Sequence, residues 1–486
     1  MSDILIQYDR VPAITWVYLS SLLTIGLFFK FSRFWSIRNL DLVALILLAP
    51  GMLLVLTGRA TAPNQNPSAD SAAEVLRQGA APATVALAAA DQPHPPTTGQ
   101  VVEHVGYIWL FVVGGFLLVR LLLDPAMIRR PLLEPNLTAG GMTFLGLSLL
   151  IFLMANVLTG PMTEDDLVGP KAAERLQTGE AASADDESTS LERHGPGFPT
   201  LFFLPKIVTS GLLRTDAQSP REQREMVFVA TARTMALLSQ LAVVLGIVLI
   251  GYQHFDNIRT GIAAAALYLL LPYTAQMTGR VDHVLPAALL VWAVLSYRLP
   301  LVSGLLMGLA IGVVYYPAFL LPLWISFYWA RGLKRFVGGV AVTLAILTLS
   351  LAFTSSSFEM FLAQARQMFG WRSPLAVTAD GFWRPEFQDQ VFRMPVLVLF
   401  VVMCISFAIW PAQKNLGTLM SCSAAIMLGT QFWHAHGGGL FMAWYLPLTL
   451  LTVFRPNLED RVALSVLGEG WLARRRTQLW RTMRAA

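Results

Sequence analysis

The chain is poor in charged residues and in cysteine. Asp, Glu, Lys and Arg make up only 13% of its 486 residues, against about a quarter in an average soluble domain. The two cysteines, Cys404 and Cys422, lie inside apolar runs, which excludes a disulfide framework and a cysteine-based metal site. Hydrophobic residues account for 55% of the chain, and the mean hydropathy is +0.57. A soluble core does not bury that much apolar surface, so the composition indicates a membrane protein.

The net charge of +5 does not indicate nucleic-acid binding. The basic residues cluster in short segments between apolar runs and in the C-terminal tail, which is a pattern of membrane orientation. We therefore expect no nucleic-acid partner. We expect the chain to contact membrane lipid.

Apolar runs of spanning length recur almost to the C-terminus. The pattern predicts an all-α, polytopic helical bundle with about 12 to 13 transmembrane helices. The two runs around Tyr315, Tyr316 and Pro317 are short for two full spans, so one broken or tilted hairpin is an equal interpretation. The runs lie near residues 12–29, 40–57, 105–123, 140–158, 229–251, 258–275, 283–297, 301–313, 317–330, 336–353, 394–412, 414–432 and 438–454.

Basic residues predict the orientation of these runs. Lys30, Arg33 and Arg38 directly follow the first run, which predicts a cytoplasmic loop there and an external N-terminus. The first run lacks a basic n-region and a cleavage site, so we interpret it as a retained helix. Later basic groups, including the tail from Arg455 to Arg484, then fall on the cytoplasmic side. We expect a multi-pass protein of the inner cell membrane with a cytoplasmic C-terminus.

Composition divides the chain into five parts. A two-helix membrane segment, 1–57, precedes a polar, Pro-rich and Ala-rich stretch, 58–104, predicted to be a disordered external linker. A third span with its cytoplasmic loop follows, and then the main membrane body with two large external loops and a basic cytoplasmic tail. The third span and its cytoplasmic loop cover residues 105–139. The main membrane body covers residues 140–454, with external loops at 159–225 and 354–393, and the tail covers residues 455–486.

Polar residues beside the predicted spans are the candidates for chemistry. Glu164, Asp165 and Asp166 follow the fourth run, where a carboxylate can act as a general base, bind a divalent cation, or simply solvate a helix end. Arg280, Asp282 and His283 lie in a short turn on the same predicted side. The arginine can bind a phosphate with its planar fork, or only pair with the neighbouring aspartate.

Two further segments face the same predicted side. His434 and His436 precede three glycines, and two histidines alone are a weak metal signal. Arg372 lies among Trp and Arg residues that suit an anionic lipid head group, although an amphipathic surface helix explains the same pattern. We assign no metal ligand, and we leave a divalent cation open as a cofactor.

The order of these features over residues 140–454 resembles the GT-C superfamily of membrane glycosyltransferases, which includes polyprenyl-phosphate-sugar-dependent mannosyltransferases. In that family an acidic residue directly after the span that precedes the first long external loop is the catalytic base. The passage from Gly195 to Pro205 and the Gly-rich stretch from Ser303 to Pro322 are also similar to family features. The chain differs where several members carry a lysine, since Tyr315 and Tyr316 precede the proline, and where His194 replaces an aromatic residue.

The resemblance implies a role for each candidate. It implies Asp165 or Asp166 as catalytic base, a polyprenyl-phosphate-linked sugar as donor, and inverting transfer at the external face. The implied donor-phosphate contacts are Arg280, Asp282, His283 and Arg372. The implied acceptor or sugar contacts are His194, Tyr316, His434 and His436. A transporter or flippase, or a noncatalytic protein of envelope assembly, remains the alternative interpretation of a chain with this many spans.

Overall fold

The computed structural model describes residues 11–61, 96–127, 133–178, 194–195, 197–212, 219–355, 357–368, 379–459, 461–463 and 467. Within these ranges every regular element is a helix, apart from an isolated β-bridge between Asn415 and Val462. The all-α class predicted from the sequence is therefore confirmed.

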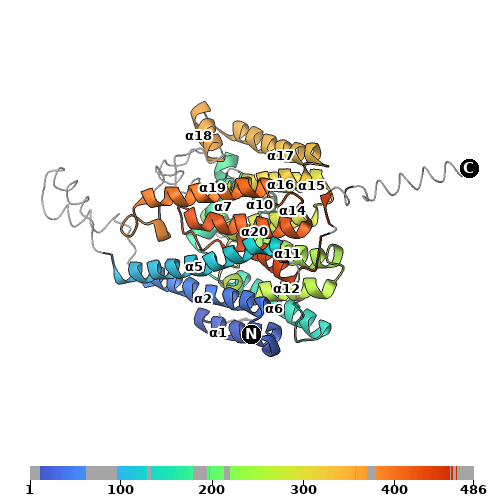
Figure 1. The fold of residues 1–486 in the computed structure, drawn as a ribbon. Helices are drawn as coiled ribbons and strands as arrows, with labels where there is room; N and C mark the ends of the chain where they lie inside the picture. Colours follow the sequence, from blue (N-terminus) through green and yellow to red (C-terminus); the bar gives the residue numbers. More distant parts are fainter. Residues whose placement is uncertain are drawn as a thin grey trace, which may run out of the picture.

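Figure 1 shows the arrangement of the helices. The α-helices of the membrane body are α1 (Ala13–Phe28), α2 (Ile37–Thr61), α5 (Thr98–Leu123), α6 (Ala139–Thr159), α11 (Pro220–Gln253), α12 (Ile258–Leu270), α14 (Val281–Leu295), α15 (Pro300–Val313), α16 (Leu321–Tyr328), α17 (Leu333–Thr354), α19 (Arg393–Ile409), α20 (Leu416–Trp433) and α21 (Leu446–Phe454). Smaller helices connect them: α7 (Glu164–Thr178), α9 (Gly197–Leu201), α10 (Phe203–Leu212), α13 (Pro272–Gln276) and α18 (Phe358–Met368). Six 3₁₀ turns complete the set: η1 (Phe31–Arg33), η2 (Asp124–Ala126), η3 (Tyr316–Leu320), η4 (Gly381–Trp383), η5 (Gln390–Phe392) and η6 (Met442–Trp444).

Each apolar run identified in the sequence contains a helix, but the run near 438–454 is α-helical only from Leu446, and the run near 258–275 is divided between α12 and α13. Among the described residues, six helices are long and apolar enough to cross a membrane: α2, α5, α6, α11, α17 and α19. The apolar helices α1, α12, α14 and α15, and the continuous η3–α16 segment, have 10 to 17 residues. A break at Val314 separates α15 from η3 and α16, so the region around Tyr315 forms two short helical pieces.

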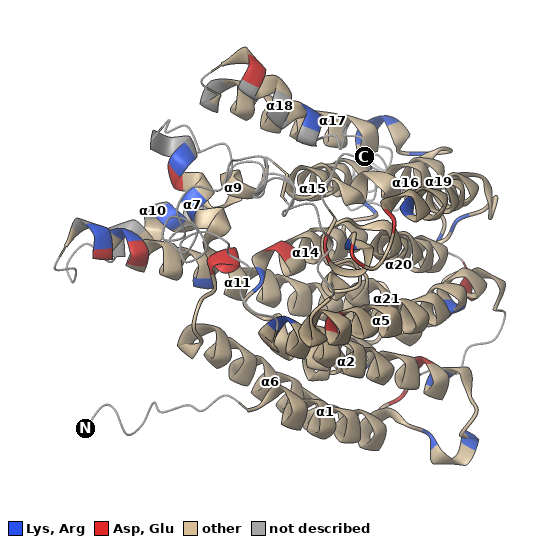
Figure 2. Ribbon diagram, turned by 90° about the vertical axis from the view of Figure 1, so that its left-hand side faces the viewer, with Lys and Arg blue, Asp and Glu red and all other residues tan. Residues whose placement is uncertain are grey.

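Large apolar side chains cover the outward faces of the outer helices. Phe144 on α6 is 76% exposed, and Leu399 on α19 is 70% exposed. Lys, Arg, Asp and Glu lie mainly in connections and near helix ends, so the helical ribbons of Figure 2 are largely uncharged. An apolar surface of this extent is unfavourable in water and matches the hydrocarbon of a bilayer.

Helices α2 and α5 pack closely along their length (Figure 1). A Cβ atom at Gly58 would lie 2.5 Å from the backbone nitrogen of Glu103, and one at Gly106 would lie 2.7 Å from that of Val55. Small residues allow such backbone approach between membrane helices. The seam runs from Asp41 to Arg59 along α2, about 27 Å of helix axis.

Helices α14 and α20 occupy the interior of the bundle, and nearly every residue of α20 is buried. Figures 1 and 2 show α17 and α18 at one margin, α1 and α6 at the opposite margin, and α14 and α20 between them. Asp282 and His283 stand in the first turn of α14, so a buried helix carries polar groups at its start.

The helices extend into both ends of the predicted linker 58–104. Helix α2 continues to Thr61, and α5 begins at Thr98 with a capping box between Thr97 and Gln100. The linker therefore begins later and ends earlier than polarity alone indicates. Residues 62–95 lie outside the described part of the chain.

Candidate functional site

The connection between α6 and α7 fixes two of the predicted catalytic carboxylates. Helix α6 ends at Thr159, and Asp165 and Asp166 lie in the first turn of α7, where the helix dipole favours negative charge. The backbone N–H and hydroxyl of Thr163 donate hydrogen bonds of 2.9 and 2.7 Å to Oδ2 of Asp166. The Asp166 side chain is 10% exposed, and its buried Oδ1 accepts no hydrogen bond.

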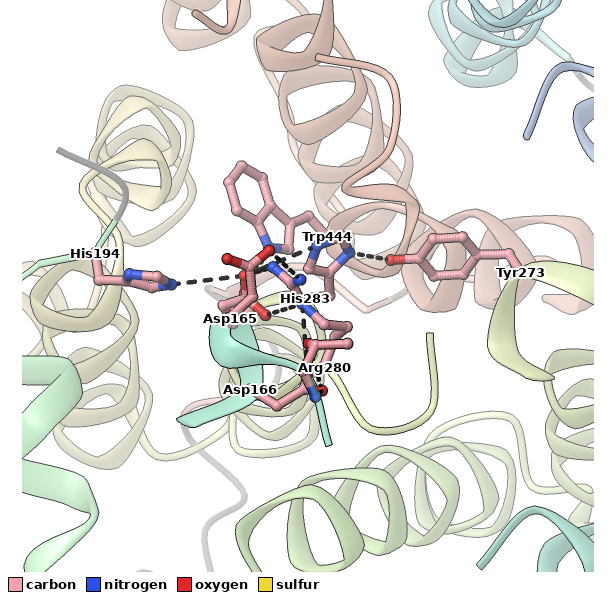
Figure 3. A network of polar contacts seen from close by, with 9 residues as sticks. Asp165, Asp166, His194, Tyr273, Arg280, His283 and Trp444 are labelled. Carbon is pink, nitrogen blue, oxygen red and sulfur yellow. Dashed lines mark hydrogen bonds and ion pairs between the residues drawn. The ribbon is translucent and has the colours of Figure 1, made fainter. Parts of the chain in front are cut away.

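Arg280 joins this turn to the start of α14 (Figure 3). Its guanidinium donates two hydrogen bonds to the carboxylate of Asp282, at 3.1 and 2.8 Å, and one of 2.9 Å to Oδ2 of Asp165. Nε of Arg280 also lies 3.9 Å from Oδ1 of Asp166. Burial alone would lower the pKa of Arg280, but the carboxylates of Asp282 and Asp165 raise it above the ordinary value, so this group stays cationic.

These four residues, Asp165, Asp166, Arg280 and Asp282, are called the open ion network. The sequence placed all of them on one predicted side of the membrane, and the structure brings them into contact. One guanidinium faces three carboxylates, so the network carries an excess of negative charge.

Aromatic and histidine side chains surround the open ion network. Nε2 of His194 lies 3.5 Å from Oδ2 of Asp282, and the His194 ring stacks on Phe198. Nδ1 of His283 lies 2.7 Å from the hydroxyl of Tyr273, and the indole of Trp444 donates to the backbone oxygen of Asp282 (Figure 3). Tyr273 and Trp444 were missed in the sequence, where Trp444 reads as an ordinary interfacial anchor.

The other predicted sugar-binding residues form a buried stack behind the network. Ring centroids are 4.6 Å apart between Tyr316 and His434, 4.7 Å between His434 and Phe441, and 4.5 Å between Phe441 and His283. Nδ1 of His434 accepts the backbone N–H of His436 at 3.0 Å. Burial lowers the pKa of His434 well below its ordinary value, so this ring is neutral at pH 7.

The segment 379–393 supports this stack from the side. His436 lies 3.6 Å from Asp380, and the indole of Trp383 donates to the backbone oxygen of Phe432. Arg393 donates to the backbone oxygen of Trp433 at 2.6 Å. These contacts close the C-terminal end of α20. The predicted phosphate contact Arg372 lies outside the described residues.

A cleft of about 310 Å³ opens beside the open ion network. Asp166 and Arg280 line it together with Thr163 and Gln276, whereas His194, His434 and His436 are absent from its lining. Its opposite wall comes from α1 and α2, through Trp16, Leu56 and Arg59. No role was predicted for these N-terminal helices, because contacts between distant parts of the chain decide which segments line the cleft.

The described residues contain no group of three or more His, Cys, Asp or Glu side chains arranged to hold a metal ion. The carboxylates of the open ion network instead face a guanidinium. The arrangement places a carboxylate that can accept a proton, Asp166, and a guanidinium, Arg280, side by side at the cleft.

A second set of charges lies at the opposite end of the α2–α5 seam. Arg120 contacts Asp41 at 2.8 Å and Asp124 at 3.0 Å, and Arg455 contacts Asp124 at 2.7 Å. These four residues, Asp41, Arg120, Asp124 and Arg455, are called the closed ion network. Two cations balance two carboxylates, and all four side chains are buried or nearly so.

Comparison of the chain with protein-family models, curated proteins and solved structures gives no match.

Proposed function

We propose that this protein is a membrane glycosyltransferase of the GT-C kind that transfers a sugar from a polyprenyl-phosphate donor to an acceptor hydroxyl. The observation that carries the proposal is that Asp166 and Arg280, a carboxylate and a guanidinium fixed by their neighbours, line one cleft. The proposal includes about 12 to 13 spans, an external N-terminus, a cytoplasmic C-terminus and an inner-membrane location, which place the cleft at the external face.

Asp166 is the better candidate for the general base. Asp166 lines the cleft, and two hydrogen bonds from Thr163 hold its carboxylate in place to accept a proton from the acceptor. Asp165 is half exposed, bonds to Arg280 and is absent from the cleft lining. We assign Asp165 to positioning Arg280.

The proposed step balances as an inverting displacement. The acceptor hydroxyl loses its proton to the carboxylate of Asp166 and forms a bond to the anomeric carbon. The bond between that carbon and the phosphate oxygen breaks, and its electron pair passes to the leaving phosphate. Arg280 stabilises this developing charge.

The test is transfer of labelled sugar from a panel of polyprenyl-phosphate sugars by purified protein in lipid bilayers. We expect Asp166→Asn to lower turnover by about 10²- to 10⁴-fold, because general-base catalysis contributes that much. The matched control is Asp256→Asn, an exposed aspartate paired with Arg461 away from the cleft. Equal turnover by wild type and Asp166→Asn contradicts the assignment, and donor translocation without transfer favours a transporter.

A further inference from the structure

The cleft lining combines charged and apolar side chains. Its charged residues are Arg59, Arg280 and Asp166. Its apolar residues include Trp16, Leu56 and Phe152, of which Trp16 and Phe152 stack with ring centroids 5.3 Å apart. A lining that contains two guanidinium groups and aromatic surface suits an amphiphile with an anionic head and an apolar chain.

Arg59 is oriented toward this cleft by α5. Its Nε donates to Glu103 at 2.9 Å and its Nη2 to the hydroxyl of Tyr107 at 2.7 Å, while 45% of the side chain stays exposed. Glu103 is shared with Arg384, whose Nη2 lies 3.5 Å away. Arg384 also lies 3.9 Å from Glu386. Because Arg59 lines the cleft and nearly half of its side chain is exposed, its guanidinium can still contact a ligand there.

The close seam between α2 and α5 places Arg59. Gly58 precedes it, and any side chain there would meet the backbone of Glu103. The two helices therefore hold the guanidinium and its carboxylate partner in register, which is the pre-organisation that a phosphate site requires.

We propose that the N-terminal helices complete the lipid-phosphate site of this protein. Arg59 and Arg280 bind the phosphate from opposite walls, and Trp16, Leu56 and Phe152 bind the first units of the polyprenyl chain. This inference rests on the proposed function and assigns to α1 and α2 a direct part in donor binding.

The experiment measures binding of a sugar-free polyprenyl phosphate, and of the matching polyprenol, to full-length protein in lipid nanodiscs. Arg59→Gln is expected to weaken polyprenyl-phosphate binding about 10- to 100-fold, as expected for loss of a charged hydrogen bond, and to leave polyprenol binding unchanged. Arg59→Lys retains charge without the fork, so it recovers part of the loss. Trp16→Ala is expected to weaken binding of both lipids.

Arg384→Gln is the matched control, because it also removes one partner of Glu103 but its side chain is absent from the cleft lining. Binding that falls equally in Arg59→Gln and Arg384→Gln overturns the proposal, since the effect then passes through Glu103. Inorganic phosphate is expected not to displace the lipid at equal concentration, and displacement would mean that the site recognises free phosphate.

The two proposals fail differently. If sugar transfer occurs and is not changed by Arg59→Gln, the proposed glycosyltransferase function is supported and the lipid-phosphate site assigned to α1 and α2 is contradicted. Phosphate-dependent lipid binding that requires Arg59, without any sugar transfer, supports this site and contradicts the transferase.

Discussion

The two ion networks are built from the same side-chain types and differ in what surrounds them. The closed ion network pairs two arginines with two aspartates, and Asp124 within it is fully buried. In the open ion network one arginine meets three carboxylates beside a cleft, and Asp165 is 51% exposed. Charges that are balanced and enclosed hold helices together, whereas unbalanced charges beside a cleft are available for a ligand or a proton.

The α2–α5 seam connects the closed ion network to the wall of the cleft. These helices carry Asp41 and Arg120 at one end and Arg59 and Glu103 at the other. Helix α2 contributes Leu56 and Arg59 to the cleft lining, and α5 holds Arg59 through Glu103.

The largest expected effect on stability comes from breaking the closed ion network. Arg120→Ala leaves the buried carboxylates of Asp41 and Asp124 with less compensation, and loss of one partner of a buried pair costs about 3 to 5 kcal/mol. We expect a large fall in the unfolding midpoint in detergent, measured by tryptophan fluorescence. Combining Arg120→Met with Asp41→Leu should recover much of the loss. Equal midpoints for Arg120→Ala and wild type would show that this network is not structural.

A smaller effect is expected at the end of the seam that carries Arg59. Gly58→Val places a branched side chain against the backbone of Glu103, and overpacking of this kind costs about 1 to 3 kcal/mol. Because Arg59 is the next residue, we also expect weaker polyprenyl-phosphate binding. Gly26→Val is the control, since nothing lies within 4 Å of a Cβ at that position. Normal lipid binding by Gly58→Val would separate the seam from the cleft.

The smallest effect is pH-dependent and concerns a buried histidine outside both networks. His254 follows α11, its Nε2–H donates to the backbone oxygen of Leu295 at 2.7 Å, and burial lowers its pKa to about 4. Folding thus favours the neutral ring, so this stability is complete above the ordinary pKa of about 6.5 and is lost as pH falls toward 4.

Between pH 7 and 5.5 we expect His254 to cost about 1 kcal/mol of stability. Unfolding midpoints of wild type and His254→Gln at both pH values measure this difference. An identical pH dependence in the two proteins would show that His254 does not titrate with folding.

Hydropathy predicted where the helices lie but not how they are arranged around the bundle. Asp165, Arg280 and Asp282 were predicted to share one side because depth in the membrane follows from the order of apolar runs. Which helices meet there depends on packing between distant segments, so the parts played by Trp444, Tyr273 and Arg59 were not predictable. The extent of α2 and α5 into residues 58–104 was also missed, because the Arg59–Glu103 pair bridges segments that polarity alone reads as a linker.

The most direct measurement compares Asp166→Asn with Asp124→Asn in the same bilayer preparations, recording sugar-transfer turnover per folded molecule and the unfolding midpoint. The account predicts that Asp166→Asn abolishes most turnover and leaves the midpoint close to that of wild type, because an amide oxygen can still accept both hydrogen bonds from Thr163. It predicts the reverse for Asp124→Asn, since that carboxylate holds Arg120 and Arg455 together. Wild-type turnover in Asp166→Asn, or loss of turnover without loss of stability in Asp124→Asn, would contradict it.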